Sequence, residues 1–88
     1  PDKFDNKITI FPNPASDNVH IMMSDENFDL INLKLYDVLG EIKMQKKIIC
    51  NNVVNEIIFS VVDLMNGVFF IELEYNNKMM ISKLVVKK

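Results

Sequence analysis

Few residues in this sequence have side chains that perform nucleophilic or acid–base catalysis at neutral pH. His20 is the only histidine and Cys50 the only cysteine, so a thiol nucleophile would need the fold to bring these two together. His20 takes the phase opposite to Val19 and Ile21, which predicts a solvent-facing position on a strand. Cys50 follows two isoleucines and is interpreted as a small apolar residue at a strand end. The pair is therefore weak support for an enzyme.

Acidic residues occur in two groups that could bind a cation or transfer protons. Asp25, Glu26 and Asp29 form an oxygen-rich loop of the kind that holds Ca²⁺, but their spacing lacks the EF-hand pattern and favours a solvated turn. Glu72 and Glu74 share one face of a strand, where an exposed surface explains them as well as acid–base chemistry does. The sequence has neither a clustered Cys/His zinc pattern nor a glycine-rich phosphate loop. We expect no metal, no cofactor and no catalytic residue.

Length and composition bound the class of protein. The chain has 88 residues, 49% of them hydrophobic and 25% charged, which is typical of one small globular domain. No apolar run approaches the roughly 18 residues of a membrane-spanning helix. The 10 basic residues are all lysines, 12 residues are acidic, and the net charge is −2. Without arginine or a dominant basic face, nucleic acid is not an expected partner.

Hydrophobic alternation with a period of two residues recurs along the chain and predicts short strands. The alternating segments are residues 8–10, 19–23, 31–36, 42–45 and 69–75. Turn-forming residues separate them at 12–14, 17–18, 37–40, 66–67 and 76–77. The stretch 61–66 is long enough for only one helical turn, and we interpret it as a connection. About seven strands spaced in this way predict an all-β protein, a β-sandwich.

Residues 79–88 end the chain with apolar side chains bracketed by lysines. This pattern predicts a final strand whose lysines protect an exposed sheet edge from unwanted pairing. A chain end beside a sheet edge also offers a handle to a partner, which could bind it by strand pairing or by charge.

Four short motifs occur in order along the sequence. They are Phe-Pro-Asn-Pro at 11–14, Asp-Val-Leu-Gly at 37–40, Asn-Gly-Val-Phe at 66–69 and Lys-Leu-Val-Val-Lys at 83–87. Each motif alone is a weak signal. Together, at this spacing and with the last one near the chain terminus, they resemble the type A C-terminal sorting domain of the type IX (Por) secretion system of Gram-negative bacteria. The resemblance extends from about Ile8 to Lys88.

The resemblance implies an immunoglobulin-like antiparallel β-sandwich of about seven strands, with residues 1–7 as a linker end and 8–88 as the sandwich of a single domain. Family members form the carboxyl-terminal domain of cargo proteins that cross the inner membrane by means of an amino-terminal signal peptide. In the periplasm the outer-membrane translocon recognises the domain. A sortase-like peptidase usually removes it as the cargo reaches the cell surface or is released. The implied domain is a secretion signal without catalytic activity.

The resemblance also assigns roles to individual residues. Those that match the first three motifs are Pro12, Asn13, Pro14, Asp37, Gly40 and Gly67. We expect them to shape the domain, because proline fixes a strand exit and glycine permits unusual backbone angles. The terminal motif is expected to be read by the translocon, with its lysines in direct contact. Its residues are Lys83, Leu84, Val85, Val86, Lys87 and Lys88.

Other interpretations stay open from the residues alone. An accessory binding module on a secreted protein usually displays a stripe of aromatic side chains, and this chain has no Trp and only two Tyr. An enzyme fragment would need Cys50 near His20. An open sheet also permits a weak homodimer through an edge strand. Pro1 is not a translation start, so a cargo is expected upstream, and the sequence identifies neither that cargo nor the cleavage site. Phe69 departs from the family, where tyrosine is commoner, and lacks its hydroxyl.

Overall fold

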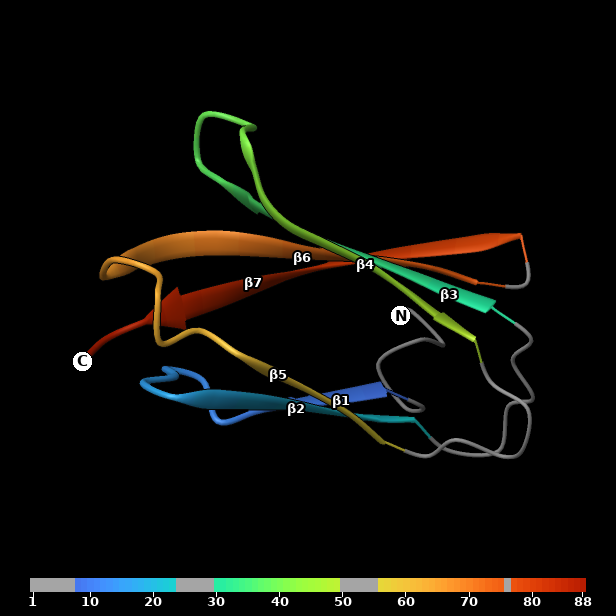
Figure 1. Ribbon diagram of the computed structural model, residues 1–88, viewed down its shortest axis with the longest axis horizontal. Helices are drawn as coiled ribbons and strands as arrows, with labels where there is room; N and C mark the ends of the chain where they lie inside the picture. Colours follow the sequence, from blue (N-terminus) through green and yellow to red (C-terminus); the bar gives the residue numbers. More distant parts are fainter. Residues whose placement is uncertain (1–7, 24–29, 50–55, 76) are drawn as a thin grey trace, which may run out of the picture.

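The computed structural model describes residues 8–23, 30–49, 56–75 and 77–88. Within these ranges the chain forms seven β-strands and no helix, and the strands stack as two layers (Figure 1). The strands are β1 (Ile8–Phe11), β2 (Asn18–Met23), β3 (Leu30–Asp37), β4 (Ile42–Ile49), β5 (Glu56–Ser60), β6 (Gly67–Tyr75) and β7 (Lys78–Val86). The all-β class and the strand number confirm the prediction made from hydrophobic alternation.

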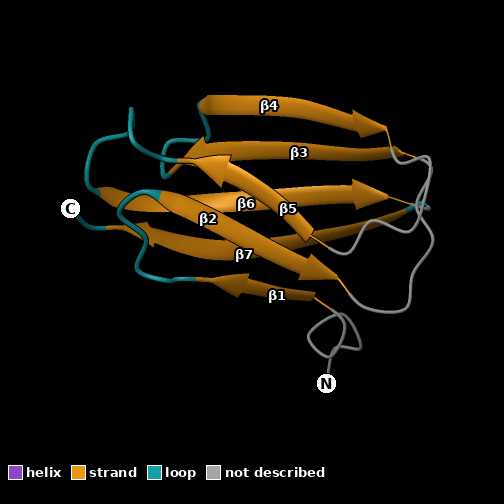
Figure 2. Ribbon diagram, turned by 60° about the horizontal axis from the view of Figure 1, so that its bottom comes forward, coloured by secondary structure: helices purple, strands orange, loops and turns teal. Residues whose placement is uncertain are grey.

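One layer is a three-stranded sheet in the order β1-β2-β5, and the other is a four-stranded sheet in the order β4-β3-β6-β7. Every strand pair within the two sheets is antiparallel. Figure 2 shows β1, β2 and β5 lying across one face of the larger sheet. The chain changes sheet after β2, after β4 and after β5, as in the Greek-key connections of immunoglobulin-like sandwiches. This arrangement confirms the predicted immunoglobulin-like β-sandwich.

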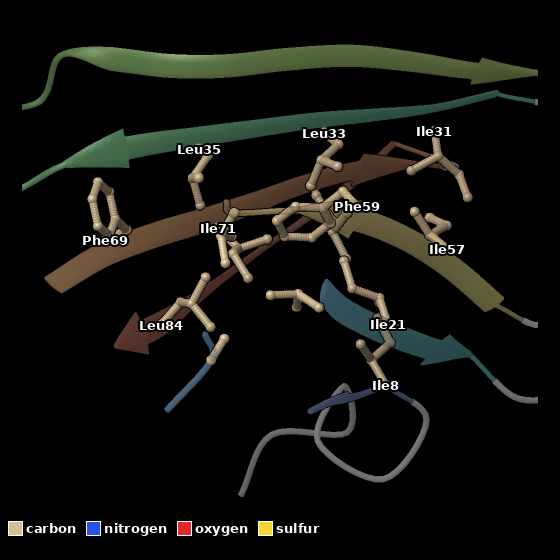
Figure 3. Close-up of a cluster of buried hydrophobic side chains, with 14 of the residues drawn as sticks. Ile8, Ile21, Ile31, Leu33, Leu35, Ile57, Phe59, Phe69, Ile71 and Leu84 are labelled. Atoms are coloured by element: carbon tan, nitrogen blue, oxygen red, sulfur yellow. The ribbon is translucent and has the colours of Figure 1, made fainter. Parts of the chain in front are cut away.

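The hydrophobic core lies between the two layers and consists of alternate residues of the strands. Its completely enclosed side chains include Val19, Ile21, Ile31, Leu33, Leu35, Ile71, Leu73 and Leu84. Figure 3 shows Leu33, Leu35 and Ile71 of the larger sheet pointing toward Ile21 and Phe59 of the smaller one. Each such side chain contributes about 1.5–3 kcal/mol by leaving water, so burial of this face is the main force that joins the sheets.

Strand β4 is the only one of the described strands without a buried residue, so its sequence alternation does not predict its burial. A β-bulge between Leu35 and Tyr36 pairs Met44 with Leu35 but Ile42 with Tyr36. Met44 therefore packs against the core, whereas Ile42 follows Tyr36 to the outer side and is 50% exposed. The sequence shows two alternating apolar residues, but the extra residue of the bulge puts them on opposite faces.

The described turns after β1 and after β3 occur where the sequence predicts them, whereas residue 76 of the predicted turn at 76–77 lies outside the described residues. Strand β1 ends at Phe11, directly before Pro12, and the Phe11–Pro12 and Asn13–Pro14 peptide bonds are cis. Between β3 and β4 the Gly40 N–H donates to the carbonyl of Asp37 at 3.0 Å. Gly40 has a φ of 84°, as expected for a turn closed by glycine. Residues 61–66 form a turn rather than a helix, which confirms their interpretation as a connection.

Several predictions fall on parts of the chain that the structure does not describe. The linker end at residues 1–7, the acidic group of Asp25, Glu26 and Asp29, and Cys50 all lie outside the described residues.

Candidate functional site

The residues predicted to be read by the translocon lie on β7 and directly after it. Among the described strands, β7 pairs only with β6 and forms one edge of the larger sheet. Leu84 and Val86 point into the core and are 0% and 1% exposed. Lys83 and Lys87 are exposed, and Val85 between them is half-buried. The pleat of the strand thus divides the terminal motif into residues that pack and residues that face solvent.

The free edge of β7, which is the edge that faces away from β6, is bound by the first motif. The Asn13 side chain donates through Nδ2 to the carbonyl of Lys83 at 3.0 Å and accepts through Oδ1 from the N–H of Val85 at 2.9 Å. Two residues later, the Ala15 N–H donates to the carbonyl of Val85 and the Ala15 carbonyl accepts from the N–H of Lys87, both at 2.8 Å. Ala15 is completely buried. The two motifs predicted from opposite ends of the sequence therefore form one structural unit.

The chain terminus is also held from its other side, by the connection between β5 and β6. The Lys88 N–H donates to Asn66 Oδ1 at 2.9 Å. The Lys88 ammonium donates to the carbonyls of Val62 at 2.5 Å and Leu64 at 2.7 Å. Lys88 is exposed, yet both its backbone and its side chain have defined partners. Its structural role is to fix the end of the chain, in contrast to Lys83 and Lys87.

The segment that reaches β7 is itself anchored on the outer face of the smaller sheet. The Phe11 ring stacks on His20, with ring centroids 5.1 Å apart and planes 5° apart. His20 Nδ1 and Glu56 Oε2 share a hydrogen bond of 2.7 Å, which joins β2 to β5. The outer-face position of His20 agrees with its predicted phase, although contacts with Phe11 and Glu56 leave it only half-exposed. The histidine thus supports the start of the first motif.

The second motif forms a rigid turn around one carboxylate. Asp37 Oδ1 accepts from the backbone N–H groups of Leu39 and Glu41, both at 2.9 Å. These bonds, that of Glu41 first, lower the pKa of Asp37 below its usual value, and the nearby Lys43 ammonium adds to the effect against partial desolvation. Lys43 donates to Glu41 Oε1 at 3.1 Å, and this bond raises the Lys43 pKa. Asp37 and Gly40 therefore both take part in the hydrogen bonds that close this turn.

The other predicted carboxylates lie on β6, and the third motif lies at the start of this strand. Glu72 and Glu74 both face outward on β6, as predicted, and the Tyr36 hydroxyl donates to Glu72 Oε1 across the sheet. Gly67 begins β6 with a φ of 157°. This face of the sheet is open, and among the described residues no group of three or more Asp, Glu, His or Cys side chains is placed to hold a metal ion.

A cleft of about 410 Å³ opens beside the second motif, between the β3–β4 turn and the β5–β6 connection. Its lining residues are Asp37, Lys43, Asp63, Leu64, Met65 and Phe69. Asp37 and Lys43 are already engaged in the turn, so their hydrogen-bonding capacity is directed within the domain. The Phe69 ring lines this cleft from the core side.

Sequence reasoning missed the contact between the first motif and β7. An asparagine between two prolines does carry a signal, because its side-chain amide matches the donors and acceptors of a peptide group. The sequence does not say which of the sheet edges that amide meets. The two hydrogen bonds from the Lys88 ammonium were missed for the same reason, since their carbonyl acceptors belong to a loop more than twenty residues away in sequence.

Comparison with known proteins assigns the family. The described residues define an immunoglobulin-like module whose most distinctive feature is a carboxyl-terminal strand held at its free edge and at its end. The chain belongs to the secretion system C-terminal sorting domains, whose family model matches residues 9–87. No curated protein sequence matches the chain. No helix in the described part of the chain is long and apolar enough to cross a membrane.

Membership of this family gives the function in outline. The domain is a C-terminal sorting signal for the type IX secretion system. The protein that carries it is exported to the cell surface or secreted.

Proposed function

We propose that the secretion machinery reads the outward side of β7, and that Lys83 and Lys87 make the direct contacts. The observation that carries this proposal is the division of the terminal motif by the strand pleat, which leaves these two lysines and Val85 on the solvent side. Neither Lys83 nor Lys87 forms an ion pair with another described residue. Their ammonium groups are therefore available to carboxylates of a partner.

The remaining residues of the terminal motif act indirectly in this proposal. Leu84 and Val86 keep the strand in the sheet, because their burial would be lost if the strand separated. Lys88 fixes the chain end through Val62 and Leu64. In this proposal Leu84, Val86 and Lys88 act by holding the strand in position. Lys83 and Lys87 act by direct contact, and Val85 contributes to both.

The wider pathway is proposed from family membership. Residues 1–88 act as one domain in which 1–7 are the end of a linker, and the carrier protein passes through the periplasm. A sortase-like peptidase then removes the domain, which performs no catalysis itself.

A reporter protein fused to the amino terminus of residues 1–88 tests the proposal in cells that contain a type IX system. Deleting the terminal residues would also remove Leu84 and Val86 from the core, so substitution is the sharper experiment. We expect the Lys83→Ala/Lys87→Ala variant to remain folded and to lose surface display. Lys46→Ala/Lys47→Ala, which removes two exposed lysines of β4, is the matched control and should be displayed normally. Equal display of the two double variants would contradict the proposal.

We also propose that the domain forms a weak homodimer through the edge strand β4. The support is that β4 pairs only with β3 among the described strands. Lys43, Lys46 and Lys47 lie on this strand and oppose tight association, since antiparallel pairing of two copies brings lysines close together. Sedimentation equilibrium should show an association that strengthens with salt and with Lys46→Ala. A monomer under all these conditions would contradict the dimer.

A further inference from the structure

Two pairs of hydrogen bonds along the free edge of β7 have the same arrangement, but only one pair is formed by backbone atoms. Around Val86, Ala15 forms a parallel β-bridge, with its N–H bound to the residue before and its carbonyl bound to the residue after. Around Leu84, the next inward-facing residue toward the start of β7, the same two places are filled by the side chain of Asn13. The Asn13 amide therefore stands where a peptide group of a neighbouring strand would stand.

The backbone of Asn13, which lies between Pro12 and Pro14, forms none of the backbone hydrogen bonds to β7 that Ala15 forms. Its side chain takes the place that a backbone rung would have on this edge. The carboxamide of asparagine supplies one donor and one acceptor in a plane, as a peptide does. One side chain thus adds a second rung beside the rung of Ala15, and both rungs lie next to the residues whose side chains enter the core.

We propose that Asn13 is a positioning residue of the export signal. By completing the rung opposite Leu84 it keeps β7 ordered to its end, so that Lys83 and Lys87 project from fixed places on one side of the strand. The machinery then meets a pre-ordered strand instead of paying the ordering cost at binding. This inference rests on the proposed reading of Lys83 and Lys87, and it adds a residue seventy positions before Lys83 that touches no partner itself.

Amide hydrogen exchange of the 88-residue chain tests the positional part. The Val85 N–H has Asn13 Oδ1 as its acceptor, so in Asn13→Ala we expect it to exchange about tenfold faster. Leu33, in the middle of the larger sheet, should exchange as in the unchanged protein. Asn18→Ala, which removes an exposed amide outside the contacts to β7, is the control. If Val85 and Leu33 accelerated together, Asn13 would support the whole sandwich and the positioning role would be wrong.

Surface display of the reporter fusion tests the functional part. We expect Asn13→Ala to reduce display about threefold, because the fraction of molecules with an ordered terminal strand falls. Asn13→Asp keeps the acceptor for Val85 but sets a carboxylate oxygen against the Lys83 carbonyl in place of the donor, so its display should also fall below that of the unchanged fusion. Full display of Asn13→Ala, with Val85 exchange accelerated, would overturn the inference.

The two proposals fail in different ways. If Lys83→Ala/Lys87→Ala were displayed normally while Asn13→Ala was not, the lysine contacts would be wrong and the positioning of β7 would stand. If the lysine variant lost display while Asn13→Ala kept it, the lysine contacts would stand and the positioning role would be wrong.

Discussion

The backbone N–H of Val85 donates to the side-chain oxygen of Asn13 at 2.9 Å, across 72 positions of the sequence. This bond joins the first described turn of the domain to its last strand. The carboxyl terminus of the sandwich is therefore a part of the folded structure whose order depends on residues near the amino terminus.

The pleat of β7 predicts that neighbouring residues of the terminal motif have different effects on stability. Leu84→Ala removes a completely enclosed side chain and should reduce the free energy of unfolding by about 2–5 kcal/mol. Lys83→Ala changes an exposed residue and should alter it by less than about 0.5 kcal/mol. Urea unfolding followed by circular dichroism measures both. Similar losses for the two variants would show that β7 does not pack as described.

The turn between β3 and β4 requires glycine at its last position. Gly40 has a φ of 84°, and no heavy atom beyond Gly40 and its two chain neighbours lies within 4 Å of the place where a Cβ would be. The cost of Gly40→Ala is therefore one of backbone strain alone, about 1–2 kcal/mol. Gly40→Asn should cost less, because asparagine tolerates the left-handed region. The midpoints of urea unfolding give the comparison, and equal costs for alanine and asparagine would argue against strain as the cause.

The hydrogen bonds of Asp37 predict a pH dependence of stability. Because Glu41 and Leu39 donate to the carboxylate, its pKa in the folded protein lies below the unfolded value of 3.8. The contribution of the charged group is thus present above that pH and is lost as the pH falls through the depressed pKa. The difference in unfolding free energy between the unchanged protein and Asp37→Asn should be constant near neutrality and shrink in acid. A difference independent of pH would contradict this interpretation.

The departure at Phe69 predicts a tolerated substitution. The Phe69 ring lines the cleft beside Asp37 and Asp63, where a hydroxyl would have polar neighbours. Phe69→Tyr should change the unfolding free energy by less than about 1 kcal/mol. Phe59→Tyr is the matched control, since Phe59 lies in the core at 2% exposure and its added hydroxyl would cost about 1–3 kcal/mol without a partner. Equal costs at the two positions would show that the cleft does not accommodate the hydroxyl.

Local sequence patterns were sufficient to predict the sandwich. Alternation identifies the inward residues of β6, such as Phe69 and Leu73, because each strand has one face in the core and one in water. Alternation fails at Ile42, because a β-bulge adds one residue to β4 and reverses which of its side chains face the core. The position of that bulge depends on how β4 pairs with β3. No pattern within β4 alone contains that information.

The candidate site could be predicted only in part, for a related reason. The terminal motif was recognisable as a strand, and its alternation already separates Leu84 from Lys83. The partnership of Asn13 with β7 could not be read, because it is fixed by the packing of one sheet on the other and not by any spacing along the chain. The same holds for the Lys88 ammonium, whose carbonyl partners are brought to it by the path of the β5–β6 connection.

The central claim is that the secretion machinery reads the outward lysines of an ordered β7. The most direct measurement is the affinity of the fluorescently labelled 88-residue chain for the purified type IX outer-membrane translocon, at two salt concentrations. We expect the unchanged chain to bind, and Lys83→Ala/Lys87→Ala to bind at least about tenfold more weakly with a smaller dependence on salt. Equal affinity and equal salt dependence for the two proteins would contradict the claim.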